Sequence, residues 1–145
     1  MQFQNILVVC IGNICRSPTA ELLLKARLPG KQVHSAGLGA LVDKPMDAKA
    51  LAVAAAHGLD GAAHSARQLT RELAQQADLI LVMEQSHLKG VCQLAPEARG
   101  KTYLLDKWSG GADIPDPYRQ SQEAFDHVFS MMERAAAGWI RVLGQ

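Results

Sequence analysis

The chain has 145 residues, of which 48% are hydrophobic, and 15 Lys and Arg against 14 Asp and Glu give it a net charge of +1. This length and composition predict a single domain over residues 1–145, and they exclude long disorder and a disulfide-stapled miniprotein. The charge balance argues against nucleic-acid binding through overall positive charge, and no apolar run approaches the roughly 18 residues that direct membrane insertion needs. The chain has three cysteines, an odd number that cannot all pair within one chain, and its first residues do not resemble a secretory signal peptide. Both features predict a cytoplasmic protein, because the cytosol keeps thiols reduced.

Short apolar strands and helices alternate along the sequence. The first strand is expected at residues 6–10, where apolar residues follow one another without polar alternation, as in a strand buried on both faces. A helix is expected over 17–28, since Ser17-Pro18 is typical of a helix start and Pro29-Gly30 of a helix end. The other predicted elements are, in chain order, strand 32–36, helix 47–57, helix 70–76, strand 78–83, helix 86–94, strand 101–105, loop 109–118 and helix 121–143.

This order of elements predicts an α/β fold of three layers. A four-stranded parallel sheet would carry helices on both faces, because strands that alternate with helices pair in parallel. Ligands of such sheets bind beyond the carboxyl ends of the strands. Cys10 stands at the end of the first predicted strand. We therefore expect a functional loop directly after this strand.

The sequence CIGNICRSP at residues 10–18 has the properties of a phosphate-binding loop. A loop of this length can wrap a tetrahedral anion with its backbone N–H groups, and the helix that follows adds its positive N-terminal end. Arg16 can bind two phosphate oxygens, and the same field stabilises a thiolate on Cys10, to which Ser17 can donate its hydroxyl. The residues whose backbone would surround the phosphate are Ile11, Gly12, Asn13, Ile14 and Cys15.

A second motif lies in the predicted loop near the end of the chain. Asp116 is flanked by Pro115 and Pro117, which would hold its carboxyl group rigidly over the edge of the sheet. A carboxylic acid in this place can protonate a poor leaving group such as a phenolate. Tyr118 would then form a wall for an aromatic ring, while Asp113 is a rival acid without flanking prolines.

Together these motifs resemble the low-molecular-weight protein tyrosine phosphatase family, and the resemblance extends over essentially the whole chain. Segments 35–37, 64–69 and 78–83 add to it. The resemblance implies that Cys10 is the nucleophile of a ping-pong reaction, Arg16 the phosphate clamp and Asp116 the general acid, with no metal or other cofactor. It also implies a hydrogen-bond network that supports the loop, made by Asn13, Ser35 and His64.

Within this family, residues 114–119 and Ala124-Phe125 are similar to the bacterial enzymes of capsule and exopolysaccharide export. The partner implied is a phosphotyrosine protein, a tyrosine autokinase with a tyrosine-rich tail, and the phosphatase would be a monomer or weak dimer. Segment 38–41 has no aromatic residue where eukaryotic-type members usually carry one on the pocket wall, so Leu38 or Leu41 would take that place in substrate binding.

Other functions remain open at this point. An arsenate reductase of the same fold needs two further cysteines, and the later part of the chain has only Cys92. A non-catalytic phosphate-binding or phosphocysteine carrier module would need no general acid. Cys15 would serve either in packing or in a reversible disulfide that protects Cys10. Trp108 would be a core or rim aromatic or a substrate contact, and the cysteine spacing does not fit a zinc site.

Overall fold

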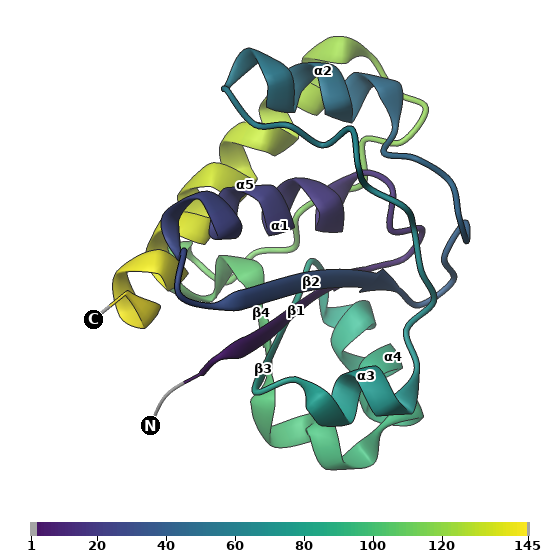
Figure 1. The fold of residues 1–145 in the computed structure, drawn as a ribbon, viewed down its shortest axis with the longest axis vertical. Helices are drawn as coiled ribbons and strands as arrows, with labels where there is room; N and C mark the ends of the chain where they lie inside the picture. Colours follow the sequence, from purple (N-terminus) through teal and green to yellow (C-terminus); the bar gives the residue numbers. More distant parts are fainter. Residues whose placement is uncertain (1–2, 145) are drawn as a thin grey trace.

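The computed structural model describes residues 3–144 and contains one four-stranded parallel sheet with the strand order β2-β1-β3-β4. The strands are β1 (Asn5–Cys10), β2 (Gln32–Gly37), β3 (Leu79–Val82) and β4 (Thr102–Leu104). Because all strands run in parallel, their carboxyl ends meet at one edge, on the right in Figure 1. The central strands β1 and β3 are almost wholly buried, as their unbroken apolar runs predict.

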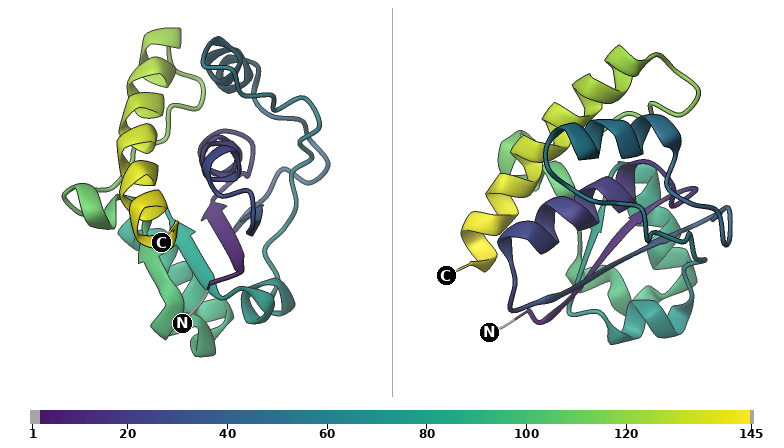
Figure 2. Two further views of the ribbon diagram at one scale, coloured as in Figure 1. Left: turned by 60° about the vertical axis from the view of Figure 1, so that its left-hand side comes forward. Right: turned by 45° about the horizontal axis from the view of Figure 1, so that its top comes forward.

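Helices cover both faces of the sheet, so the predicted α/β fold is confirmed. One face carries α1 (Arg16–Arg27), α2 (Ala48–Ala56) and α5 (Gln122–Leu143), as Figures 1 and 2 show. The other face carries α3 (Arg71–Gln76) and α4 (Gln85–Leu94). Two 3-10 helices, η1 (Pro96–Lys101) and η2 (Leu105–Ser109), flank β4 and shorten it relative to the predicted strand 101–105.

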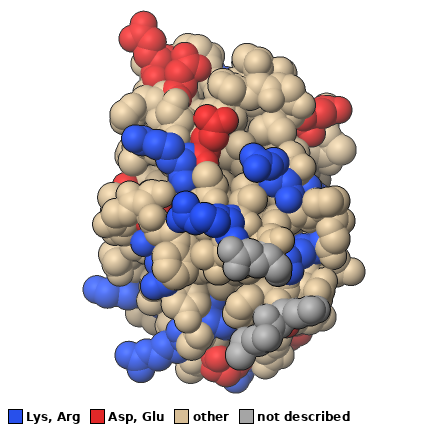
Figure 3. Space-filling model, turned by 90° about the vertical axis from the view of Figure 1, so that its left-hand side faces the viewer, with Lys and Arg blue, Asp and Glu red and all other residues tan. Residues whose placement is uncertain are grey.

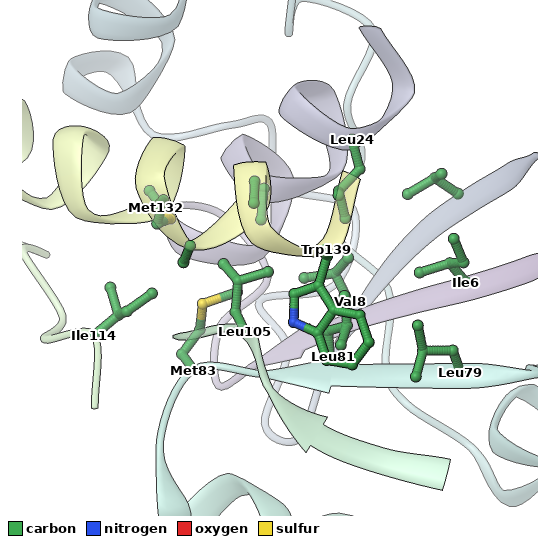
Figure 4. Packing of buried hydrophobic residues seen from close by; sticks show 14 of the residues in the cluster. Ile6, Val8, Leu24, Leu79, Leu81, Met83, Leu105, Ile114, Met132 and Trp139 are labelled. Atoms are coloured by element: carbon green, nitrogen blue, oxygen red, sulfur yellow. The ribbon is translucent and has the colours of Figure 1, made fainter. Parts of the chain in front are cut away.

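The two faces of β1 contribute to different parts of the core. Ile6, Val8 and Cys10 lie in the cluster between the sheet and helices α1 and α5, whereas Leu7 and Val9 lie on the α3 and α4 side. This division follows from the two-residue period of a strand. Figure 4 shows the α5 side, where the large side chain of Trp139 packs over the sheet among aliphatic residues. The sulfur of Cys10 is therefore directed to the layer that holds the start of α1.

The basic residues near the end of α1 stabilise the fold locally. Lys25 forms an ion pair with Glu21 at 2.7 Å, and the Lys31 ammonium donates a hydrogen bond of 2.8 Å to the backbone oxygen of Phe3. Lys25 and Arg27 stand in the last turn of α1, where cations complement the helix dipole. Figure 3 shows this side of the molecule, on which Lys and Arg outnumber Asp and Glu; it is remote from the carboxyl ends of the strands.

Within residues 3–144, no helix has the length and apolar character to cross a membrane.

Candidate active site

The predicted loop joins the end of β1 to the start of α1. β1 ends at Cys10 and α1 begins at Arg16, so the loop lies at the N-terminus of a 12-residue helix. The Cys10 sulfur lies 2.9 Å from the Ser17 hydroxyl oxygen, and both residues are buried. The positive end of the helix dipole is thus directed at the sulfur, which favours a negative charge there.

Asn13 fixes the backbone of this loop from inside. It is fully buried and adopts a left-handed conformation with φ of 58°, which asparagine tolerates better than most residues. Its side-chain amide donates to the hydroxyls of Ser17 at 2.8 Å and Ser35 at 3.0 Å. Its side-chain oxygen accepts from the Arg67 backbone N–H at 2.9 Å, and its backbone oxygen lies 2.6 Å from His64 Nε2. The structure therefore brings together the three residues predicted to support the loop.

The direction of these hydrogen bonds shows that Asn13 does not take up the Ser17 proton. Because a backbone N–H can only donate, the bond from Arg67 identifies the Asn13 oxygen and hence the orientation of its amide. The amide nitrogen must then donate to Ser17, so the single hydroxyl proton of Ser17 remains available to the Cys10 sulfur at 2.9 Å. Ser17 can therefore donate to a thiolate at this position. The Ser35 hydroxyl likewise accepts a hydrogen bond from the Asn13 amide, and it donates one of 2.6 Å to the Glu21 carboxylate.

Arg16 is held with one part of its guanidinium group engaged. Its side chain is 3% exposed, and Nη1 donates to the Glu84 carboxylate and, at 2.8 Å, to the backbone oxygen of Ile114. Nη2 lies 3.8 Å from the Asp116 carboxylate, and neither Nη2 nor Nε makes a hydrogen bond to any residue in the range 3–144. This leaves the Nε–Nη2 edge, the geometry that binds two oxygens of a phosphate.

A cavity of about 180 Å³ opens over the loop. Its lining residues are Ile11, Gly12, Asn13, Ile14, Cys15, Gly39, Leu41, Asp116 and Tyr118. Three of its side chains are large, apolar or aromatic and well exposed, namely Ile11, Leu41 and Tyr118, and they suit an aromatic ring. Leu41 rather than Leu38 lines this cavity, because the Leu38 side chain packs beside Gly90 of α4.

Asp116 reaches the same cavity from the loop before α5. Its side chain is 48% exposed, and one carboxylate oxygen accepts a hydrogen bond of 3.0 Å from the Tyr118 backbone N–H. The other oxygen faces Arg16. The carboxyl group is thus accessible to a substrate and oriented by its own turn, as a proton donor must be.

Asp113, the rival acid, has a different position. Its carboxylate accepts a hydrogen bond of 2.9 Å from the backbone N–H of Gln85, the first residue of α4. The next residue, Ile114, is held by two hydrogen bonds. Its N–H donates to the Met83 backbone oxygen at 2.9 Å, and its backbone oxygen accepts from Arg16 Nη1. Asp113 is therefore engaged at a helix N-terminus and ties the Asp116 loop to the end of β3.

Cys15 and Trp108 both pack against neighbouring side chains in the structure. Burial raises the pKa of the Cys15 thiol, and the carboxylates of Asp47 and Asp116 raise it further, so Cys15 stays protonated among apolar residues. All three cysteines are free thiols. Trp108 packs edge-on against Trp139 with ring centroids 5.6 Å apart and does not line the cavity.

Several supporting residues escaped the sequence reasoning. Glu84 anchors Arg16, Glu21 receives the Ser35 proton, and Arg67 orients Asn13. Glu84 could have been found, because it stands two residues beyond β3 at the same edge of the sheet as Cys10. For Glu21 and Arg67 the sequence contains no comparable signal.

Gly37 was also missed, and it provides a test of the loop geometry. A Cβ atom at this position would lie 2.2 Å from the backbone oxygen of Ile11. We therefore expect Gly37→Ala to reduce the free energy of unfolding by about 1–3 kcal/mol, as overpacking does, and to reduce phosphate binding because the loop must shift. The matched control is Gly30→Ala, where a Cβ meets no atom within 4 Å. Urea denaturation and phosphate titration would check both variants, and equal behaviour of the two would contradict the expectation.

Comparison with known proteins agrees with this geometry. Residues 5–145 match the family described as low molecular weight phosphotyrosine protein phosphatase. The chain belongs to this family. It is 52% identical over 145 residues to the Escherichia coli K12 low molecular weight protein-tyrosine-phosphatase Etp, covering 100% of this chain and 98% of that protein. It is also 52% identical over 141 residues to Wzb of the same strain, covering 97% and 96% of the two chains.

A solved structure extends the likeness to three dimensions. Vibrio vulnificus Wzb in complex with benzylphosphonate has a TM-score of 0.95 and 52% sequence identity, and the match covers 97% of this chain and 99% of that one. The predicted enzyme class is confirmed: the chain is a low molecular weight protein-tyrosine phosphatase.

Proposed function

We propose that this phosphatase hydrolyses phosphotyrosine through a phosphocysteine intermediate, with Cys10 as nucleophile, Arg16 as phosphate clamp and Asp116 as general acid and base. The observation that carries the proposal is the hydrogen-bond network at the loop, which leaves the Ser17 proton available to the Cys10 sulfur 2.9 Å away. The Nε–Nη2 edge of Arg16, which makes no hydrogen bond to residues 3–144, and the carboxyl group of Asp116 adjoin the same loop.

In the first half-reaction, the Cys10 sulfur attacks phosphorus as the bond to the tyrosine oxygen breaks. Asp116 gives its proton to that oxygen, so that tyrosine leaves neutral. Arg16 and the backbone N–H groups of the loop hold the other phosphate oxygens. In the second half-reaction, Asp116 takes a proton from water, and the water oxygen attacks phosphorus. The sulfur leaves as a thiolate that the Ser17 hydroxyl stabilises.

The charge of the transferred phosphoryl group is met by protein groups in this scheme. The guanidinium of Arg16 supplies one positive charge, and the dipole of α1 and the loop amides supply the rest. Among residues 3–144, no cluster of three His, Cys, Asp or Glu side chains is arranged to hold a metal ion. We accordingly expect the reaction to proceed with EDTA present.

For the substrate, we infer a phosphotyrosine protein and, more finely, a tyrosine autokinase of polysaccharide export in the cytoplasm. Support for the aromatic substrate comes from the exposed Ile11, Leu41 and Tyr118 side chains around the cavity and from the benzylphosphonate bound by Vibrio vulnificus Wzb. The two relatives at 52% identity and the similarity of residues 114–119 to the export-associated enzymes support the autokinase. The free thiols fit a reducing compartment.

The direct test compares phosphopeptides in the presence of EDTA. We expect release of inorganic phosphate from a phosphotyrosine peptide at a kcat/KM at least about tenfold higher than from the matching phosphoserine peptide, because only the aromatic ring reaches the apolar walls. Arsenate with a thiol reductant should not be turned over, since Cys92 in α4 is the single later cysteine. Equal rates on both peptides, or arsenate reduction, would contradict the proposal.

A further inference from the structure

The first turn of α4 contains a buried histidine for which the proposed reaction has no use. His87 is 2% exposed, and its Nε2 lies 3.5 Å from the Glu84 carboxylate oxygen that also receives Arg16. Its Nδ1 is the one buried side-chain nitrogen or oxygen in residues 3–144 that has no hydrogen-bond partner. An unpartnered buried polar atom destabilises the fold, so a residue kept here for packing alone would be better replaced by an aliphatic one.

Glu84 shows what His87 can accomplish. Glu84 occupies the position just before α4, where a carboxylate would ordinarily cap the helix, yet its side chain makes no capping hydrogen bond. The cap comes instead from Asp113, which accepts from the Gln85 N–H. The Glu84 carboxylate is thereby free to turn toward Arg16, and His87 lies beside it, three residues further along the chain in the first turn of α4.

We propose that His87 is a positioning residue for phosphate binding: it holds the Glu84 carboxylate in place, and Glu84 in turn holds Arg16 with its Nε–Nη2 edge toward the anion. We place the proton of His87 on Nε2, which faces the Glu84 carboxylate at 3.5 Å, because a carboxylate attracts an N–H and repels a nitrogen lone pair; Nδ1 is then the unprotonated acceptor. His87 touches neither substrate nor reacting atoms. It acts through two intervening side chains, those of Glu84 and Arg16. This inference rests on the proposed function of the same loop.

The charges around His87 keep it neutral near pH 7. Burial lowers the pKa of His87, and the Arg16 guanidinium lowers it further, against the opposing effect of the carboxylates of Glu84, Asp113 and Asp116. A neutral imidazole leaves the Glu84 charge to Arg16, whereas an imidazolium would compete with Arg16 for it. A neutral His87 therefore suits an enzyme in which Arg16 must stay paired with Glu84.

The test is a comparison of His87→Leu with His87→Gln by two measurements, titration with inorganic phosphate by calorimetry and steady-state hydrolysis of p-nitrophenyl phosphate. For His87→Leu we expect the phosphate dissociation constant and KM to rise about fivefold to tenfold, with kcat changed less than about threefold, because the clamp serves binding. His87→Gln retains an N–H donor and should stay within about twofold of wild type. His127→Leu, on the exposed face of α5, is the control and should change neither quantity.

The free energy of unfolding provides a second readout. Replacing a histidine that served packing alone would lower it, whereas replacing one with an unpartnered buried nitrogen should not. The unfolded chain takes up a proton on His87 as the pH falls through its ordinary value of about 6.5, while the folded state resists it. The free energy of unfolding should therefore fall with acidification in wild type and fall less in His87→Leu. At pH 5 the variant should be at least as stable as wild type, although it binds phosphate more weakly.

Three outcomes would overturn the proposal: unchanged phosphate affinity in His87→Leu, equal weakening in His87→Gln and His87→Leu, or lower stability of His87→Leu at pH 5 without loss of affinity. Should His87→Leu fail to fold, His87→Phe keeps a planar ring without nitrogen and takes its place in the same comparison. Phosphate titration requires no turnover. A wild-type protein that binds phosphate but hydrolyses no aryl phosphate would contradict the proposed function while leaving the comparison at His87 decisive.

Discussion

Cys10→Ser should abolish turnover of aryl phosphates while leaving the phosphate site intact. The expected loss in kcat is about 10⁵-fold or more, on the scale seen when a covalent nucleophile is removed from an enzyme. A serine hydroxyl at this position keeps the contact with Ser17, but an alcohol is a much weaker nucleophile than a thiol or thiolate. Arg16, Glu84 and the loop amides are untouched, so the anion should still bind.

Two measurements separate these effects. Hydrolysis of p-nitrophenyl phosphate reports the chemistry, and calorimetric titration with inorganic phosphate reports the site. The control is Cys92→Ser, which changes a half-buried thiol in α4 and should retain the activity of wild type. Residual turnover of Cys10→Ser near the wild-type rate would show that the sulfur is not the nucleophile, and loss of phosphate binding would show that the loop itself had changed.

The part of this site that could be predicted is the part encoded locally. The strand that ends at Cys10, the helix that starts near Arg16 and the turn between them depend on neighbours within a few residues, and these signals agree with one another. The parallel sheet order then places the end of β1 beside the end of β3. Local pattern and the topology rule for parallel sheets were sufficient to locate the loop between β1 and α1 as the candidate site.

The parts that escaped prediction depend on contacts across long stretches of chain. Arg16 and Glu84 are 68 residues apart in sequence, and Asn13 and Arg67 are 54 apart, so no periodicity connects them. The choice between Leu38 and Leu41 turned on which side chain packs beside Gly90 of α4, another distant contact. Identities at single positions thus indicated candidate atoms, and the tertiary fold decided which of them meet.

The short 3-10 helices were missed for a different reason. η1 and η2 have six and five residues, too few to give a helical hydrophobic period. They matter to the site because η2 leads into the loop that carries Asp116. The Asp106 carboxylate of η2 accepts from the Ala112 N–H at 2.8 Å, and this bond sets the path of the chain before Ile114. The loop that carries Asp116 is therefore positioned in part by a segment whose structure the sequence pattern did not predict.

Asp116→Asn should slow the reaction by about 10² to 10⁴-fold, with the size of the loss depending on the leaving group. The amide keeps the shape of the carboxyl group and can still accept from the Tyr118 N–H, but it has no proton to give. Tyrosine, with a side-chain pKa of about 10, leaves poorly as an anion, so its phosphate ester should suffer most. Esters of more acidic phenols need less protonation and should lose less.

A series of aryl phosphates of increasing phenol acidity, measured on wild type and Asp116→Asn, would therefore separate proton donation from simple damage to the site. We expect the dependence of kcat/KM on leaving-group acidity to be shallow in wild type and steep in the variant. Asp113→Asn is the matched comparison, because this rival carboxylate caps α4. Its dependence should stay as shallow as in wild type. A steep dependence in Asp113→Asn with a shallow one in Asp116→Asn would transfer the acid role to Asp113, whereas a uniform loss across all esters in Asp116→Asn would assign this residue to positioning alone.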